Sequence, residues 1–137
     1  MKKLTLRILH MVLAAAVLLG CTFSAPVPAL AAGLDQMEVH FMDVGQGDAT
    51  LVTCGGHAML IDAGDDSKGT AIQNYLQKQK ITKLDYLVLT HPDADHIGGA
   101  PVIITKFDIG KVFVSNFEKD NKTYQKLIQS LDDKRMK

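Results

Sequence analysis

Cysteine is scarce in this sequence, and no apolar run is long enough to cross a membrane. The chain of 137 residues has two cysteines, Cys21 and Cys54. Cys21 lies in a leader-like segment, so that only Cys54 remains once the leader is removed. This excludes an internal disulfide and a cysteine-based zinc knuckle. The longest apolar run, Ile8–Leu19, is shorter than the roughly 20 residues that a membrane-spanning helix needs.

The first 31 residues have the pattern of a bacterial export signal. Three basic residues precede the apolar run, and the small residues Ala29–Ala32 follow it. A basic start, a short apolar stretch and an A-x-A site are typical of a secretory signal peptide. We therefore expect cleavage after Ala31 and export to the medium or the cell surface. The alternative is Leu18–Cys21, which resembles a lipobox and would place a lipid on Cys21.

Positive charge is not in excess, which argues against one class of partner. Cleavage after Ala31 removes three of the 15 Lys and Arg and none of the 15 Asp and Glu. Residues 32–137 then carry 12 positive and 15 negative side chains, a net charge of −3. Nucleic-acid binding usually requires a broad basic surface. The composition argues against such a surface and leaves room only for a local one.

The rest of the chain contains strand-like and helix-like segments. Strand patterns come first, and helix and strand patterns then alternate, which favours an α/β fold whose sheet is covered by helices on one side. Strands are expected at residues 38–43, 49–53, 57–61, 84–89 and 111–114, and helices at 69–80, 98–105 and from 121 onward. Gly55 and Gly56 predict a tight hairpin, and Ser67 predicts a helix cap. The apolar run at 84–89 predicts a strand buried on both faces.

The expected strands have more apolar surface than the expected helices can cover. Neither the sheet nor the last helix has its full partner, and no helix-stop residue lies near Lys137. We therefore expect residues 32–137 to form one partial domain that continues beyond Lys137.

Four side chains that can bind metal ions follow the predicted strand at 84–89. His91, Asp93, Asp95 and His96 lie within six residues, and each can coordinate a divalent ion once deprotonated. In an extended turn, residues 91 and 93 point to the same side, whereas residues 95 and 96 enter the next turn and can reach a second ion. The alternative is a solvated acidic turn with two incidental histidines. Four such residues directly after a buried strand favour a metal site.

Three segments carry a resemblance to a known family. Thr90–Gly99 resembles the H-x-[HD]-x-D-H motif of the metallo-β-lactamase superfamily, and Phe41–Ala49 and Leu60–Gly64 match that family further. Together they are most similar to the hydrolase domain of ComEC-type DNA-uptake proteins and their free-standing secreted relatives. The resemblance implies an αββα metallo-β-lactamase sandwich with a two-metal site between its sheets, of which this chain holds the N-terminal half.

The same resemblance implies a role for each site residue. His91 and Asp93 would bind the first metal ion, Asp95 and His96 the second, and Asp62 would support the ligands from behind. Asp95 would also orient the attacking hydroxide or accept its proton. Many members of the family carry His where this chain has Asp93. The additional carboxylate makes manganese and iron the alternatives to zinc, which is the first expectation.

Part of the family's ligand set is absent from this sequence. The family supplies one further histidine to each metal and a bridging aspartate from later in the chain, whereas no histidine follows His96 here. Two protein ligands for each ion are fewer than the three of a usual catalytic zinc site. We therefore expect this chain by itself to hold two ions weakly and to be inactive.

Other polar residues have plainer interpretations. His40 and His57 are expected to be solvent-facing or hydrogen-bonded strand residues, and Cys54 a small strand residue of the buried kind. Asp43 and Asp48 flank a glycine loop that the resemblance places beside the active site. The last helix is expected to have a solvated face that carries Lys119, Lys122 and Lys126.

These observations predict a secreted metal-dependent hydrolase that uses a hydroxide activated by two metal ions. Likeness to the subgroup favours phosphodiester bonds, in a small molecule or in nucleic acid. The enzyme alternative is a lactamase or another ester or amide hydrolase. The alternative from a different class is an inactive truncated product or a binding module that kept the fold. The sequence predicts no membrane span in the mature chain and leaves the oligomeric state open.

Overall fold

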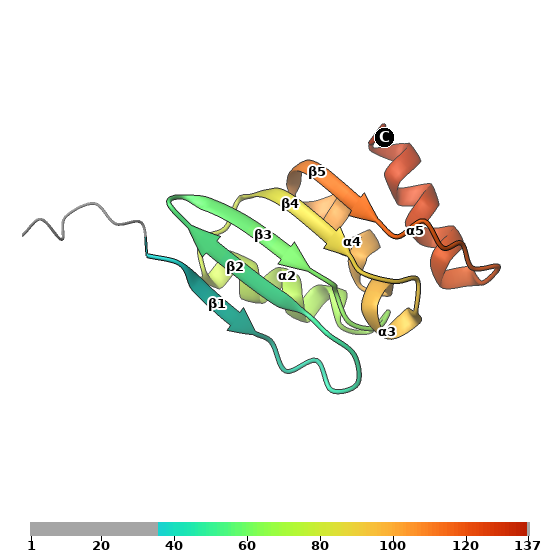
Figure 1. Ribbon diagram of the computed structural model, residues 1–137, viewed down its shortest axis with the longest axis horizontal. Helices are drawn as coiled ribbons and strands as arrows, with labels where there is room; N and C mark the ends of the chain where they lie inside the picture. The colour runs from blue at the N-terminus through green and yellow to red at the C-terminus, as the bar shows by residue number, and fades with distance from the viewer. Residues whose placement is uncertain (1–35, 137) are drawn as a thin grey trace, which may run out of the picture. The chain divides into compact units, whose positions relative to one another are not determined.

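The computed structural model describes residues 36–136, which form a five-stranded mixed sheet with helices (Figure 1). Its elements are β1 (Glu38–Phe41), β2 (Thr50–Cys54), β3 (His57–Ile61), α2 (Gly69–Lys78), β4 (Lys83–Leu89), α3 (Ala94–Ile97), α4 (Ala100–Lys106), β5 (Asp108–Val114) and α5 (Lys122–Asp133). The expected leader, the cleavage site after Ala31 and the lipid alternative at Cys21 lie outside the described residues. Within residues 36–136, none of the helices has the length and apolarity to span a membrane.

Strand direction brings three loops to one edge of the sheet. The strand order is β1-β2-β3-β4-β5, with antiparallel pairs β1/β2 and β2/β3 and parallel pairs β3/β4 and β4/β5. Gly55 and Gly56 close the β2–β3 hairpin with φ angles of 57° and 80°, as a type I′ turn requires, so the predicted hairpin is confirmed. Because β1, β3 and β4 run in the same direction, the loops that follow them meet at the same edge.

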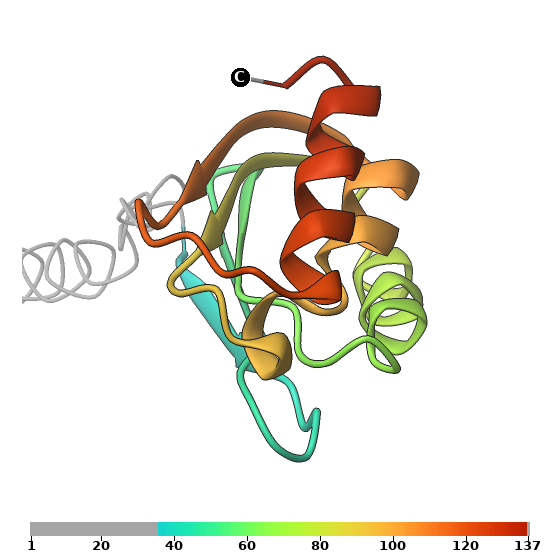
Figure 2. The same cartoon turned by 90° about the vertical axis from the view of Figure 1, so that its right-hand side faces the viewer.

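Helices cover one face of the sheet, as the sequence pattern predicts. Figure 2 shows α2, α4 and α5 on the same side of the strands. The leucines that point to this side are almost completely buried, among them Leu51, Leu60 and Leu87. Burying one such side chain stabilises the folded state by roughly 1.5–3 kcal/mol. The layer between the sheet and the helices is therefore the hydrophobic core, and it supports the edge of the sheet where the three loops meet.

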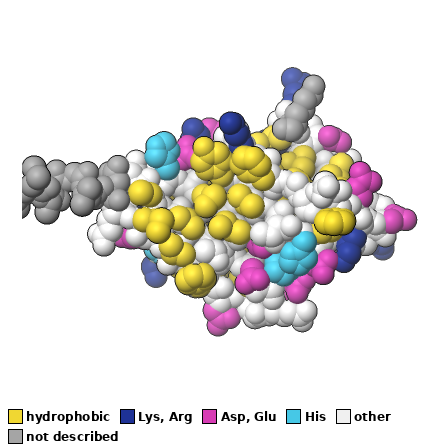
Figure 3. Space-filling view, in the orientation of Figure 1, with side chains coloured by type: hydrophobic (Ala, Val, Ile, Leu, Met, Phe, Trp, Pro, Cys, Tyr) yellow, Lys and Arg dark blue, Asp and Glu magenta, His cyan; other side chains and the backbone are white. Residues whose placement is uncertain are grey.

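The other face of the sheet is apolar and exposed. Val39 and Phe41 are on it with 43% and 83% of their surface accessible, and Tyr86 contacts Phe113 there with ring centroids 6.1 Å apart. Figure 3 shows hydrophobic side chains gathered over the strands on this face. The prediction that the strand at 84–89 is buried on both faces is therefore wrong, because Tyr86 in the middle of β4 is 41% exposed. The expected shortage of covering material is confirmed for the described residues.

Two details of the helices differ from expectation. Ser67 does not cap α2, whose N-cap position is occupied by Lys68 without a side-chain hydrogen bond. Ser67 instead donates its backbone amide and hydroxyl to Asp65 Oδ1, at 2.7 and 2.6 Å, which makes a tight turn before the helix. The helix expected at 98–105 is present as α4, which begins at Ala100, and a short helix that was not expected, α3, precedes it. In α5 the Asn121 side chain accepts the Tyr124 amide at 2.9 Å and caps the helix start.

The histidines and the cysteine outside the loop edge have structural surroundings. His40 shares a hydrogen bond with the Tyr75 hydroxyl (2.9 Å), and His57 Nδ1 lies 3.2 Å from Asp85 Oδ2. Both histidines therefore fit the plain interpretation of hydrogen-bonded strand residues. Cys54 is exposed at the end of β2, so that the expectation of a buried cysteine is wrong: the hairpin turn carries this position out of the core.

Asp85 gives the fold a defined pH dependence. Its carboxylate accepts the Ala58 amide at 3.0 Å and faces His57, and these contacts lower the pKa of Asp85 below its ordinary value, with the Ala58 hydrogen bond as the largest cause. A lowered folded-state pKa stabilises the protein above the unfolded pKa, near 3.9, and the gain disappears as the pH falls through the folded value. We expect Asp85→Asn to lower stability at pH 7 and to have a smaller effect at acid pH.

Urea unfolding at pH 7 and pH 3 would check this expectation. Asp108→Asn, which changes an exposed aspartate at the start of β5, is the matched control and should show little effect at either pH. A stability loss of Asp85→Asn that is equal at both pH values would contradict the linkage.

Candidate metal centre

The candidate site is built on the turn of residues 90–96, called here the histidine turn, which follows β4. Two other segments are hydrogen-bonded to it or to each other at the loop edge of the sheet. Ala63 N donates to His96 O at 2.7 Å, and Gly64 N donates to Asp48 O at 2.9 Å. The loops after β1, β3 and β4 are therefore fixed to one another by the backbone before any side chain is considered.

Asp62 lies behind the histidine turn. It is the one buried charged side chain among residues 36–136, with 3% of its surface exposed. Its Oδ1 accepts the Thr90 amide at 2.9 Å, and its Oδ2 accepts the Thr90 hydroxyl at 2.6 Å. The same Oδ2 lies 3.0 Å from His96 Nδ1. Three donors from the turn thus share one buried carboxylate, which compensates for its loss of water.

These bonds define which nitrogen of each imidazole is free. His96 Nδ1 donates to Asp62, because a carboxylate can only accept. The Thr90 hydroxyl gives its proton to Asp62, so its oxygen accepts from His91 Nδ1 at 2.9 Å. In their neutral form both imidazoles would therefore carry the proton on Nδ1 and offer the Nε2 lone pair to a metal ion. A carboxylate behind a histidine is the usual way in which proteins orient imidazole ligands.

The two histidines lie close together. Their ring centroids are 3.8 Å apart, and one ligand atom each of Asp62, His91 and His96 lies within 4.8 Å of the others. Asp62 belongs to this set by distance, but its two oxygens already accept three hydrogen bonds. This favours the predicted supporting role of Asp62 over direct ligation. The residues present fit a divalent ion by their donor chemistry, nitrogen and carboxylate oxygen.

The predicted aspartate ligands are arranged less tightly than the histidines. Asp93 Oδ2 lies 3.9 Å from His91 Nε2, so these two atoms face the same space. The other oxygen of Asp93 accepts a hydrogen bond from Lys119 Nζ, which is the largest cause of the lowered pKa of Asp93. Within the described residues, neither Asp93 nor Asp95 joins the three-residue set. Their roles as ligands remain predictions.

A glycine loop, residues 42–49, lies against the histidine turn. Gln46 Nε2 donates to Asp95 Oδ2 at 3.2 Å, and Asp48 Oδ2 lies 3.8 Å from His96 Nδ1. Gly47 has a φ of 96°, and a Cβ at this position would be 1.8 Å from the Asp95 carbonyl oxygen. Only glycine allows the two backbones to approach so closely. The expectation that this loop borders the candidate site agrees with these contacts.

Sequence reasoning missed two residues at the site. Gln46 stands between two glycines of a loop already singled out, and that position was the available signal. Lys119 gave a misleading signal, because it was expected on the solvated face of the last helix. It instead precedes α5 and binds Asp93, which corrects that interpretation. Lys126 does lie on α5, where it forms an ion pair with Asp66 at 3.0 Å.

A match to a known protein family shows the superfamily to which the chain belongs. Residues 42–123, more than half of the sequence, match the family described as the metallo-beta-lactamase superfamily. The chain therefore belongs to the metallo-β-lactamase superfamily, a class of metal-dependent hydrolases. The family predicted from the three sequence segments is confirmed, and so is the predicted fold class, within the part that the structure describes.

Individual relatives share only part of their length with this chain. It is 39% identical over 75 residues to Recombination protein 2 of Haemophilus influenzae, and the match covers 51% of this chain and 9% of that protein. This match agrees with the predicted likeness to the ComEC-type branch.

Two solved structures are similar at low identity. A metallo-β-lactamase HARLDQ motif mutant of Cronobacter sakazakii is 22% identical, with a TM-score of 0.43 over 47% of this chain and 26% of that one. The metallo-β-lactamase FIM-1 of Pseudomonas aeruginosa in its mono-zinc form is 15% identical, with a TM-score of 0.43 over 69% of this chain and 41% of that one.

Proposed function

We propose that this chain is part of an exported metal-dependent hydrolase that cleaves phosphodiester bonds. The observation that carries the proposal is the chain of hydrogen bonds from Asp62 through Thr90 to His91 and directly to His96. In neutral imidazoles this arrangement favours the tautomer with the proton on Nδ1, which leaves Nε2 free. If the two histidines had only a structural role, we would expect their Nε2 atoms to have hydrogen-bond partners as well. The shared carboxylate instead holds the rings through Nδ1 alone.

The residues of the histidine turn would hold two divalent ions. His91 and Asp93 would bind one, and Asp95 and His96 the other, with zinc as the first expectation and manganese or iron as alternatives. When bound, such ions lower the pKa of a water molecule and neutralise the negative charge that develops on the reacting group.

The protein's own side chains would arrange the reaction. Asp62 and Thr90 hold the imidazoles, so that the ligands need no reorganisation when an ion arrives. Gln46 binds Asp95 Oδ2 and leaves Oδ1 of the same carboxylate to orient the attacking water or to accept its proton. The hydroxide would form a bond to phosphorus while the opposite P–O bond breaks, and the proton taken up by Asp95 would pass to the departing alkoxide, which leaves as an alcohol.

The substrate class and the location rest on separate supports. The relative from Haemophilus influenzae is named for recombination, a process that acts on nucleic acids, and this favours phosphodiester bonds.

The leader pattern of residues 1–31 supports export. The mass of the exported product would test the location: a start at Ala32 or a lipid on Cys21 would support export, and a full-length leader would contradict it.

Asp95→Asn is the test of the proposed reaction. In the protein expressed from its whole reading frame, we expect this change to lower kcat for bis(p-nitrophenyl) phosphate by about 10²–10⁴-fold, the usual contribution of a general base. Zinc or manganese should be required, and a β-lactam should not be hydrolysed at a comparable rate. Asp133→Asn, at the end of α5, is the matched control. Unchanged turnover of Asp95→Asn would overturn the role of Asp95, and turnover without any divalent ion would overturn the proposed function.

A further inference from the structure

Lys119 is a cation that directly contacts a predicted ligand of the candidate metal centre, Asp93. It lies in the loop between β5 and α5, and its ammonium donates to Asp93 Oδ1. Among residues 36–136, Lys83 and Lys126 also form ion pairs with aspartates, Asp85 and Asp66, but neither aspartate is a predicted metal ligand. The side chain is 46% exposed. Lys119 is therefore held at the site and remains open to solvent.

The ammonium has unused hydrogen-bonding capacity. A lysine head carries three donors and no acceptor, and Asp93 Oδ1 takes one of them. The other oxygen of Asp93 is directed towards His91 Nε2. One carboxylate therefore lies between the imidazole of His91 and the ammonium of Lys119. Two donors of Lys119 remain beside the space that a substrate at the histidine turn would enter.

We propose that Lys119 binds an anionic oxygen of the phosphodiester substrate. This inference rests on the proposed function and adds a specificity-determining residue to it. A charge-assisted hydrogen bond from an ammonium to a phosphate oxygen is a common and strong form of phosphate recognition. It discriminates a charged diester from a neutral ester, which offers no negative oxygen to this lysine.

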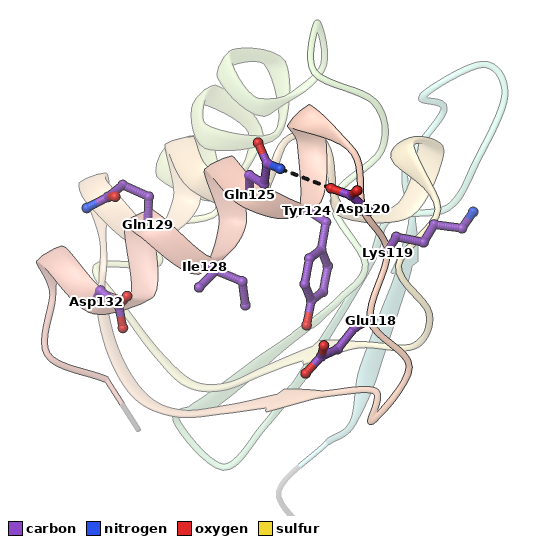
Figure 4. A pocket seen from close by; sticks show the side chains of 8 residues that line it. All are labelled: Glu118, Lys119, Asp120, Tyr124, Gln125, Ile128, Gln129 and Asp132. Carbon is purple, nitrogen blue, oxygen red and sulfur yellow. Dashed lines mark hydrogen bonds between the residues drawn. The ribbon is translucent and has the colours of Figure 1, made fainter.

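The surface next to Lys119 limits recognition to a single phosphate. A groove of about 550 Å³ follows α5, and its charged lining residues other than Lys119 are Glu118, Asp120 and Asp132. Figure 4 shows Lys119 extending away from Tyr124 and Glu118, out of this groove. Three carboxylates repel a second phosphate along the groove. The binding constant should therefore depend only weakly on salt. A plot of its logarithm against the logarithm of the salt concentration should have a slope of about −0.7, as expected for one phosphate contact of a single strand.

The probe for this proposal is a thymidine dinucleotide, which contains one phosphodiester, together with its neutral methylphosphonate analogue. Binding to the chain is measured by NMR titration, with zinc and without it, for the unaltered protein, Lys119→Gln, Lys119→Arg and Lys126→Gln. We expect Lys119→Gln to weaken binding of the dinucleotide about tenfold, the usual effect of losing one hydrogen bond to a charged group. Lys119→Arg should retain most of the affinity. Lys126→Gln removes the same charge from α5 and should leave affinity unchanged.

The outcomes separate this proposal from the function on which it rests. Loss of affinity confined to Lys119→Gln and to the charged dinucleotide would support it. Equal weakening in Lys119→Gln and Lys126→Gln, equal weakening for the neutral analogue, or no binding to the unaltered protein would overturn it. The zinc content of the same samples is a separate measurement, and it tests the proposed metal centre. The affinities of the variants are compared both with and without zinc, so that the role of Lys119 is judged independently of metal binding.

Discussion

Asp62→Ala should lower stability by about 3 kcal/mol and weaken zinc binding 10- to 100-fold. The substitution leaves the Thr90 amide, the Thr90 hydroxyl and His96 Nδ1 without their buried acceptor, and each unsatisfied donor costs about 1–3 kcal/mol. Loss of a carboxylate behind a histidine ligand usually reduces metal affinity by that factor. Urea unfolding and zinc titration of the same sample measure the two effects.

Asp66→Asn is the control for this change. Asp66 follows the same strand and is exposed, with its carboxylate paired to Lys126 on α5, so that its replacement should alter stability by less than about 1 kcal/mol. If Asp62→Ala bound zinc as tightly as the unaltered chain, Asp62 would not orient the histidines. A stability loss no greater than that of Asp66→Asn would contradict the hydrogen-bond arrangement itself.

Gly47→Ala should lower the free energy of unfolding by more than the strain of one left-handed residue. A positive φ costs a non-glycine residue roughly 1–2 kcal/mol, but at Gly47 the added carbon would also lie 1.8 Å from the Asp95 carbonyl oxygen. The glycine loop must then move, and Gln46 loses its contact with Asp95. We expect a destabilisation of about 2–4 kcal/mol together with a shift of the Gln46 side-chain amide signals in the NMR spectrum.

Gly56→Ala separates the two causes. Gly56 also has a positive φ, 80°, but no heavy atom lies within 4 Å of the position of its Cβ. Its substitution should therefore show the backbone cost alone, about 1 kcal/mol, and should leave the Gln46 signals in place. Equal destabilisation by the two alanines would show that the close approach of the glycine loop to the histidine turn is absent.

Much of the fold could be predicted because its signals are local. The hairpin at Gly55 and Gly56 requires positive φ angles that glycine accepts, and the strand expected at 57–61 is present with those bounds as β3. The apolar run of β4 was interpreted as buried on both faces because sequence shows hydrophobicity but not what packs on each side. Tyr86 and Leu87 are neighbours on opposite faces of β4, and Leu87 is fully buried whereas Tyr86 is 41% exposed.

The sequence singled out some residues of the candidate site but not the side chains that reach it from distant loops. His91 and His96 stand out by spacing within one turn, and Asp62 follows from family resemblance. Gln46 and Lys119 reach the turn across 49 and 26 residues of sequence. Such contacts depend on how three loops meet at one edge of the sheet, which no local periodicity encodes. Lys119 in particular looked like part of an amphipathic helix that begins three residues later.

The protonation of the two imidazoles tests the central claim most directly. Long-range ¹H–¹⁵N NMR spectra of the chain, recorded at pH 8 before and after addition of zinc, report which ring nitrogen of His91 and His96 carries hydrogen. The arrangement around Asp62 predicts that both rings carry hydrogen on Nδ1 before zinc is added, and that zinc then shifts the Nε2 signals alone. Hydrogen on Nε2 of either ring, or signals that zinc leaves unchanged, would contradict the proposed metal centre.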